Sequence, residues 1–299
     1  MELTKNFFDK NIVPILIVPG LLLYTSFLVF PIIGTIFLGF TKWEGINIAN
    51  LKIIGFGNYL ELIHDKIFWK SLFHNVIFVC IATTIQFLLS LILALCLNMG
   101  LRFTGVFKGV IFLPQVLAFI GIAFLFKFIF APPYAQGLLN NFFIKIGLEK
   151  LVHAWLGDKN TVLLTIIGVH IWRETGFTTL LILAGLATIP ESLYDASKID
   201  GAGRLQTLWH ITLPLLREIN IVVITLTVIY ALRVFEYIFA MTGGGPNYAS
   251  EVLATYIYRE AFEGGRLGYS SAIATVFFII MTSFTFIYLK VTKAGTMKL

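Results

Sequence analysis

Charged side chains are scarce in this sequence. They make up 13% of its 299 residues, whereas hydrophobic residues make up 58%. A soluble domain usually carries roughly a quarter charged residues. One globular core cannot bury this much apolar surface, but a lipid bilayer can surround it. The composition therefore excludes an ordinary soluble domain and predicts a protein embedded in membrane lipid.

The formal net charge of +6 does not indicate a nucleic-acid partner. Binding to nucleic acid needs basic residues gathered in a stripe or cluster. Here they are scattered through the segments between apolar stretches. Basic segments beside apolar spans are typical of membrane proteins, in which they set the orientation. We expect no nucleic acid among the partners.

The motifs of common catalytic centres are also missing. No Gly-x-x-x-x-Gly-Lys-Ser/Thr loop occurs, so the chain does not hydrolyse ATP by the usual means. The five histidines lack metal-ligand spacing, and there is no Gly-x-Ser-x-Gly elbow. Cys80 and Cys96 would lie about 24 Å apart on one helix, too far for a disulfide. We expect no catalytic residue, metal or bound cofactor. An intramembrane enzyme remains an alternative, although only His170 and Glu174 come near a shared depth.

Six stretches are long and apolar enough to cross a bilayer, which takes about 20 residues of helix. None alternates with the period of two that a barrel strand shows. The sequence predicts an all-α polytopic membrane protein with one transmembrane domain over residues 1–299. Pro19 and Pro31 should bend the first span and Pro114 the third. No small-residue cleavage site follows the first span, so we expect it to be retained. The predicted spans are residues 12–40, 72–97, 109–130, 162–187, 219–241 and 271–289.

The second span carries a polar patch. Its members are Thr83, Thr84, Gln86 and Ser90. Polar side chains inside membrane helices commonly form hydrogen bonds between helices. We expect this patch to contact a neighbouring span.

The distribution of lysine and arginine predicts the orientation. The side that holds both termini has shorter segments, so its basic residues are denser there. Residues 98–108 and the tail after residue 289 carry basic residues and no acidic ones. Cytoplasmic segments carry such an excess. We expect both termini in the cytoplasm.

Residues 188–218 form the most polar long segment between two spans. Pro190 suits the start of a short helix, Gly201 interrupts it, and a second short helix should end at Pro214. Small residues on both sides of Gly201 would let the backbone of another protein approach closely. The segment is either a docking site for a partner or an ordinary connector that packs on its own spans.

This segment resembles the EAA motif of ABC importer permeases. The resemblance rests on residues 193–202, Leu-Tyr-Asp-Ala-Ser-Lys-Ile-Asp-Gly-Ala, followed by Ile-Thr-Leu-Pro at 211–214. Asp195 stands where the family usually has Glu, and Ser197 replaces its second Ala. In that family the segment is a coupling helix that sits in a cleft of the cytoplasmic ATPase. The coupling residues that the resemblance implies are Leu193, Asp195, Ala196, Ser197, Asp200, Gly201, Ala202 and Pro214.

Further stretches resemble the carbohydrate-uptake class of these permeases. They are Phe-Gly-Asn-Tyr at 56–59, Phe-Trp at 68–69, Asn75, Thr-Gly-Gly-Gly-Pro at 242–246, Tyr-Ile-Tyr at 256–258 and Ala-Phe at 261–262. The resemblance implies a type I importer permease fold in a bacterial or archaeal inner membrane. It implies four partner chains: a second, related permease subunit, two ATPases that use ATP and Mg, and an extracytoplasmic solute-binding protein. The implied cargo is a sugar, an oligosaccharide or a polyol such as a glycerol phosphate.

Charged residues inside two spans mark a candidate translocation path. A charge at the centre of a span costs about 2.5–3.5 kcal/mol on insertion scales, so it usually faces a cavity or a partner. Either these residues line the path, or they form internal ion pairs without contact to cargo. Neighbours at 173 and 174 point about 100° apart on a helix, so we expect them not to pair, whereas 233 and 236 should share one helical face. The candidates are Trp172, Arg173, Glu174, Arg233, Glu236 and Tyr237.

An ion-gradient-driven secondary transporter is the main alternative to an ATP-driven importer. Such transporters often contain inverted repeats and interrupted helices near the midplane. The sequence shows no internal repeat, and six spans are few for a complete transporter. The leading hypothesis is therefore a permease subunit powered by a separate ATPase.

Overall fold

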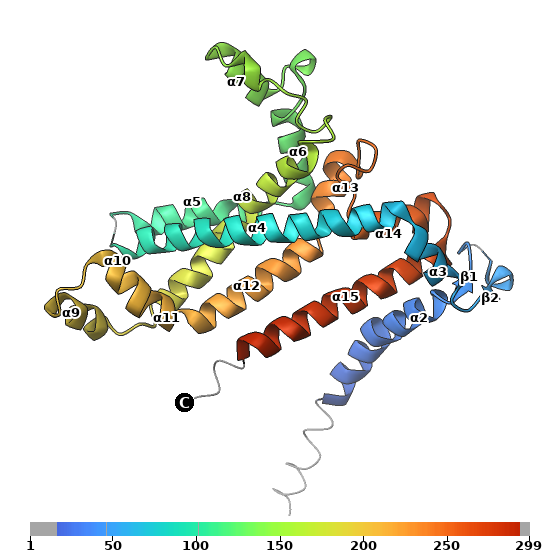
Figure 1. Ribbon diagram of the computed structural model, residues 1–299, viewed down its shortest axis with the longest axis horizontal. Coiled ribbons are helices and arrows are strands. Elements are labelled where there is room, and N and C mark those ends of the chain that lie inside the picture. The colour runs from blue at the N-terminus through green and yellow to red at the C-terminus, as the bar shows by residue number, and fades with distance from the viewer. Residues whose placement is uncertain (1–16, 46, 101, 294–299) are drawn as a thin grey trace, which may run out of the picture. The chain divides into compact units, whose positions relative to one another are not determined.

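The computed structural model describes residues 17–45, 47–100 and 102–293 (Figure 1). Contacts group the chain into two compact units, which we describe separately. The first contains the chain up to residue 65 together with residues 257–279, and the second contains residues 66–256 and the chain from residue 280. The prediction of one membrane domain over the whole chain stays a prediction.

Helices dominate both units, and each of the six predicted spans overlaps a long described helix or a bent pair of helices; residues 12–16 of the first predicted span lie outside the described residues. Four described helices are long and apolar enough to cross a membrane by themselves, and two bent pairs of helices raise the number to six if each pair is one span. The four are Ile17–Leu38, Lys66–Asn98, Arg217–Thr242 and Leu267–Tyr288, and the pairs are Thr104–Val116 with Phe119–Ile129 and Val162–Leu186 with Glu191–Ile199.

The first unit combines two apolar helices with a small sheet that the sequence did not predict. Its first span contains the π-turn η1 (Thr25–Val29), which directly precedes α2 (Phe30–Leu38) and Pro31. Proline has no amide hydrogen and cannot donate a helical hydrogen bond. The wider π-turn directly before Pro31 shifts the local hydrogen-bond pattern where that donor is missing. The other elements are β1 (Thr41–Lys42), η2 (Ile48–Asn50), β2 (Lys52–Ile53), α3 (Gly57–His64), η6 (Arg259–Glu263) and the first part of α15 (Leu267–Lys293).

Asn58, in the Phe-Gly-Asn-Tyr stretch, has a structural role. Its buried amide donates to the carbonyl oxygens of Gly39, at 2.9 Å, and Thr41, at 2.8 Å. These bonds fasten α3 to the turn that ends the first span. In the same unit Arg266 contacts Glu61 at 2.5 Å, and the Tyr269 hydroxyl donates to Asp65 at 2.6 Å.

The second unit is built around α4 (Lys66–Asn98), α8 (Val162–Leu186) and α12 (Arg217–Leu232). The Gln86 amide donates to the Thr178 hydroxyl at 2.8 Å, and the Ser90 hydroxyl donates to the Thr175 carbonyl at 3.1 Å. Because both bonds join α4 to α8, the predicted role of the polar patch is confirmed for these two residues. The described cysteines Cys80 and Cys96 are both free.

The third predicted span is two helices and not one bent helix. α5 (Thr104–Val116) and α6 (Phe119–Ile129) meet at an angle of 96°. Pro114 lies in the last turn of α5, and Leu117 after it is extended. The bend expected near Pro114 is therefore present as a full break, which begins at Leu117, three residues after the proline.

α5 packs against α8 at Gly176. A Cβ atom at this glycine would overlap the backbone of Ile111 and touch that of Phe112. Gly168, two turns earlier on α8, has open space at the corresponding point. Close backbone approach at small residues is a common way for membrane helices to pack.

Gly176→Ala should therefore lower the melting temperature of the purified protein. The added methyl forces the two backbones apart, and overpacking typically costs about 1–3 kcal/mol. Gly168→Ala is the matched control, and it should leave the melting temperature unchanged or raise it slightly because alanine favours a helix. Equal melting temperatures for the two variants would contradict this packing.

The fifth predicted span is also interrupted. α12 ends at Leu232, and α13 (Glu236–Thr242) begins after three residues. Arg233 caps α12, and Glu236 is the first residue of α13. The prediction that these two residues share a face of one continuous helix was wrong. α14 (Leu253–Tyr258) follows an irregular segment.

Residues 130–161 form a small structure of their own between α6 and α8. It contains η3 (Pro133–Ala135), α7 (Leu138–Lys145) and η4 (Glu149–Leu151). Buried Asn140 holds it together: its amide group donates to the carbonyls of Ala131 and His153, and its oxygen accepts from the His153 amide and the Trp155 indole.

Candidate functional site

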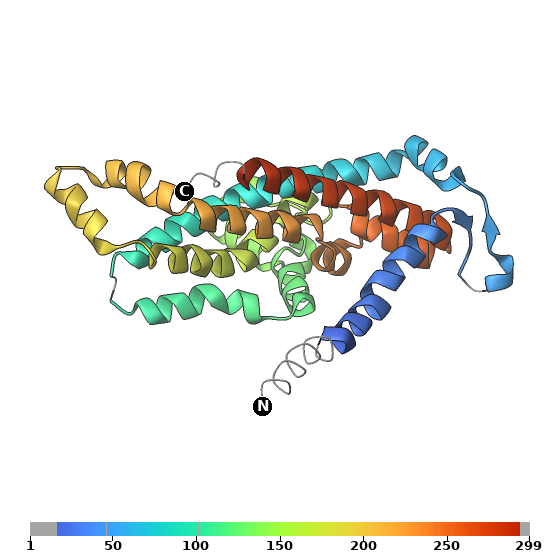
Figure 2. The ribbon, with the colours of Figure 1, turned by 90° about the horizontal axis from the view of Figure 1, so that it is seen from below.

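The segment after α8 folds as two short helical pieces with a glycine between them. α9 (Glu191–Ile199) leaves α8 at an angle of 71°. Gly201 has a φ of +72°, which favours glycine, and it turns the chain toward α10 (Arg204–Thr207). Figures 1 and 2 both show these helices projecting from the end of the second unit where α8 ends and α12 begins.

Pro214 does not end the second helical piece, as the sequence had suggested. The π-turn η5 (Leu208–Thr212) continues from α10, and Pro214 sits in the first turn of α11 (Leu213–Leu215). Proline is tolerated at the start of a helix, where its missing amide hydrogen has no partner to lose. The piece therefore runs on toward α12 at Arg217.

Hydrogen bonds brace the segment internally. The Ser197 hydroxyl donates to the Tyr194 carbonyl at 2.7 Å, and the Thr207 hydroxyl donates to Ser197 Oγ at 3.3 Å. The second bond crosses from α10 to α9, on either side of the glycine turn. A segment braced in this way is suited to move as one body.

One face of the 190–214 segment has a depression that is lined partly by small residues. A depression of about 450 Å³ is bordered by Leu193, Ala196, Ser197, Asp200, Gly201 and Ala202, among others. The exposed Asp195 side chain lies outside it and pairs with Lys198 at 2.9 Å, which raises the pKa of that lysine. Six of the eight predicted coupling residues therefore line one concave surface.

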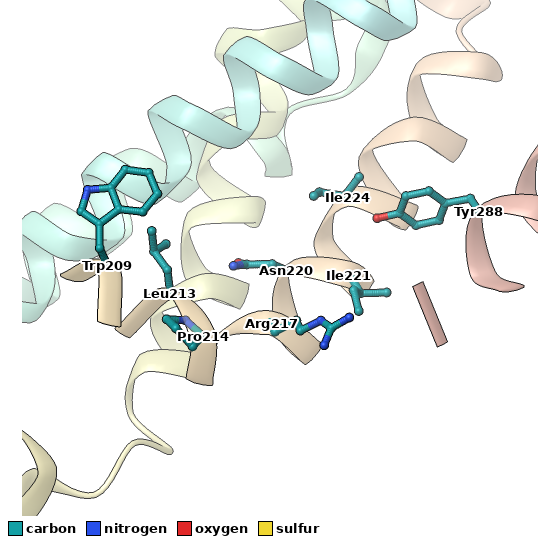
Figure 3. A pocket seen from close by; sticks show the side chains of 8 residues that line it. All are labelled: Trp209, Leu213, Pro214, Arg217, Asn220, Ile221, Ile224 and Tyr288. Carbon is teal, nitrogen blue, oxygen red and sulfur yellow. The ribbon is translucent and has the colours of Figure 1, made fainter. Parts of the chain in front are cut away.

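A second hollow, also of about 450 Å³, lies at the N-terminal end of α12. Its lining is mostly apolar, and Figure 3 shows Trp209 and Tyr288 at opposite ends of it. Pro214 belongs to this hollow and not to the first one. The hollow therefore adjoins the joint at which the segment meets α12.

A third cavity, of about 190 Å³, lies where the broken helices meet. Four of the six predicted path residues line it, namely Glu174, Arg233, Glu236 and Tyr237. Phe119, His170, Tyr230 and Val234 complete the lining. Trp172 does not reach it; its ring packs against Phe126 of α6, with centroids 5.2 Å apart.

Arg173 holds the break between α5 and α6. Its guanidinium donates to Glu174, so the prediction that these neighbours do not pair was wrong. It also donates to the carbonyl of Gln115 at 3.0 Å and lies 3.9 Å from the centre of the Phe119 ring. A break leaves helix carbonyls without partners, which is costly in lipid. Arg173 satisfies one of them, and it is therefore a structural clamp.

His170 is a cavity residue that the sequence analysis did not assign to the path. Only 2% of it is exposed, and neither ring nitrogen has a hydrogen-bond partner within the described chain. Its ring lies against those of Phe78 and Tyr237. The available signal was its position four residues before Glu174, which puts both on one face of a helix.

Asn75 joins the break in the fifth span to the segment beyond it. Its amide donates to the Leu232 carbonyl at 3.2 Å, and its oxygen accepts from the Leu253 amide at 2.8 Å. Two more contacts run parallel to it: Lys70 donates to the Asn247 carbonyl, and His74 Nδ1 lies 2.8 Å from the Glu251 carbonyl. Hydrogen bonds therefore join the start of α4, around Asn75, to the segment that follows the Gly-Gly-Gly-Pro stretch.

Asn75→Leu should lower the melting temperature of the protein. One buried and one partly buried backbone group lose their partner, and the loss of a buried partner costs about 1–3 kcal/mol. Ser71→Ala is the matched control, because the Ser71 hydroxyl is buried one turn earlier on α4 and has no partner in the described residues. A Ser71→Ala protein less stable than Asn75→Leu would contradict the bridging role.

Comparison with known proteins shows the family. The inner membrane components of binding-protein-dependent transport systems match residues 86–294, and the chain belongs to this family. It is 38% identical over 289 residues to the probable ABC transporter permease protein YurN of Bacillus subtilis, covering 96% of this chain and 98% of that one. It is 34% identical over 277 residues to the trehalose/maltose transport system permease protein MalF of Thermococcus litoralis, covering 93% and 92%.

The fold is that of an ABC importer permease. A chain in the crystal structure of a bacterial ABC transporter involved in alginate import matches with a TM-score of 0.84 at 23% identity, over 98% of this chain and 99% of that chain. The predicted fold class is confirmed. The chain is a transport component of the inner membrane and not an enzyme, and the secondary-transporter alternative finds no support among these relatives.

Proposed function

We propose that this chain is one of two related permease subunits of an importer, and that two separate ATPases drive it. The concave, glycine-turned segment at 190–214 carries this proposal. It is exposed, internally braced and continuous with α8 and α12, which also line the cavity. Closure of the ATPases would push the segment, and the segment would tilt both helices.

The same proposal assigns the sides of the membrane and the cargo. The segment and both termini face the cytoplasm, in agreement with the density of basic residues. A solute-binding protein delivers a sugar, an oligosaccharide or a related polyol or glycerol phosphate from the other side. Support comes from relatives named for trehalose and maltose or for sulfoquinovosyl glycerol, and from a matching importer structure in complex with an alginate-bound periplasmic protein.

The proposal is tested by purifying the chain from its native membrane and identifying the proteins that accompany it. We expect a second permease and an ATPase, and the complex should hydrolyse ATP faster when the loaded binding protein is added. Uptake into vesicles that contain this chain alone, driven by an ion gradient, would overturn the proposal.

A further inference from the structure

The small sheet and α3 of the first unit carry exposed apolar side chains and two exposed lysines at the end of a membrane span. We propose that they form a lipid anchor. In this anchor α3 lies in the plane of the bilayer at the Leu38 end of the first span, and the two lysines bind the phosphate of an anionic phospholipid. The inference depends only on the membrane location of the chain, and the cargo and the ATPases do not enter it.

α3 is amphipathic, and its apolar stripe faces outward. Phe56, Leu60 and Ile63 are 68%, 60% and 56% exposed. They follow one another at intervals of four and three residues, so they share one side of the helix. Asn58 and Leu62, on the other side, are buried within the unit. A helix whose apolar side faces away from its own chain is typical of segments that lie in a membrane interface.

Two hydrogen bonds fix the depth of α3. The Asn58 amide donates to the carbonyls of Gly39 and Thr41, at 2.9 and 2.8 Å. Gly39 directly follows the apolar span Ile17–Leu38, and Trp43 lies a few residues further on. Tryptophan is enriched where a span leaves the hydrocarbon. Interfacial helices lie with their apolar side about 5–10 Å into the boundary between headgroups and acyl chains, and these bonds hold α3 at the level of that boundary. Figure 1 shows β1, β2 and α3 at this end of α2.

The sheet places two like charges side by side. Lys42 of β1 lies directly opposite Lys52 of β2 in the antiparallel pair, and both are exposed. Neither forms an ion pair with a carboxylate in the described part of the chain, and Glu61 of the same unit is engaged by Arg266. Like charges directly opposite each other destabilise a sheet. A phosphate between the two ammonium groups would remove this repulsion, and at headgroup depth the lipid itself supplies the phosphate.

Fluorescence quenching in vesicles tests the position of α3. The full-length chain with Cys80→Ser and Cys96→Ser, together with the proteins that accompany it, carries Leu60→Cys labelled with an NBD fluorophore and is reconstituted in phosphatidylcholine vesicles. Glu263→Cys is the matched control, because Glu263 is exposed, acidic and in the same unit. We expect the probe at residue 60 to be quenched by a lipid with a nitroxide near its headgroup and to be shielded from iodide present on both sides of the membrane. The probe at residue 263 should show the reverse.

Three results would overturn the lipid anchor. Quenching by iodide at residue 60 as strong as at residue 263 would place the stripe in water. Shielding from iodide without quenching by the lipid nitroxide would mean that another membrane protein covers the stripe. Shielding that appears only after a loaded solute-binding protein is added would make the stripe a docking surface for that protein.

A second probe, on Ile53→Cys beside Lys52, tests the lysine pair in vesicles of phosphatidylcholine with a minor share of phosphatidylglycerol. A nitroxide on phosphatidylglycerol should quench this probe more strongly than the same nitroxide on phosphatidylcholine. Each lysine near an anionic surface contributes about 1 kcal/mol, which corresponds to a local enrichment of up to about fivefold. Lys42→Gln with Lys52→Gln should abolish the difference, whereas Lys42→Arg with Lys52→Arg should keep it. Equal quenching by both lipids, or a preference that survives the glutamines, would contradict phosphate binding by the pair.

Discussion

Arg173→Ala is expected to destabilise the protein by about 3–5 kcal/mol, because it leaves a buried charge without its partner. Glu174 is 4% exposed and pairs with Arg173. The same substitution frees the Gln115 carbonyl at the break between α5 and α6. The melting temperature and the yield of monodisperse protein in size-exclusion chromatography measure this effect.

A double substitution separates the structural role of this pair from a role in transport. Arg173→Ala with Glu174→Gln removes both charges, so much of the lost stability should return. Transport should not return, because Glu174 lines the cavity and its carboxylate is lost. Full transport by the double variant would show that the pair is only an internal ion pair. An Arg173→Ala protein as stable as the unchanged one would contradict the clamp.

Ala196→Trp is expected to weaken association with the ATPase, and so to lower transport, without harming the fold. Ala196 is exposed and borders the concave surface of the 190–214 segment, so a larger side chain has room in this chain alone. It would block close approach of an ATPase. Overpacking of about 1–3 kcal/mol corresponds to roughly 5- to 150-fold weaker association. ATPase co-purification and ATP hydrolysis stimulated by the binding protein measure the loss.

Lys198→Trp is the matched control for Ala196→Trp. Lys198 is also exposed, lies two residues further along α9 and does not line the concave surface. It loses only a surface pair with Asp195, and such pairs contribute little. We expect near-normal ATPase association for this variant. Equal losses for both variants would show that the concave surface has no special role.

The sequence predicted those features that local patterns determine. Long apolar stretches require helices in a bilayer, so the stretches that form the long helices were predictable, whereas their bounds, such as the start of α4 at Lys66, were not. The helix–glycine–helix form of residues 190–214 was predictable because Pro190 and Gly201 are local signals with known backbone preferences. Gly201 indeed has a positive φ.

Features set by distant residues were not predictable from local spacing. Neighbouring residues on a helix point about 100° apart, but the long Arg173 side chain can still bend back to Glu174. Arg173 also contacts the break between α5 and α6, which the sequence does not show. No proline or glycine marks the break at residues 233–235. At this break the side-chain amide of Asn75, more than 150 residues earlier in the chain, donates a hydrogen bond to the Leu232 carbonyl.

The position and accessibility of Ala196 test the central claim most directly. A chain with Cys80→Ser, Cys96→Ser and Ala196→Cys is probed with a membrane-impermeant maleimide, in intact cells and in inside-out vesicles with and without the ATPase. We predict labelling only in inside-out vesicles stripped of ATPase, and protection when the ATPase is bound. Labelling of intact cells, or labelling unaffected by the ATPase, would contradict a cytoplasmic segment that a separate ATPase drives.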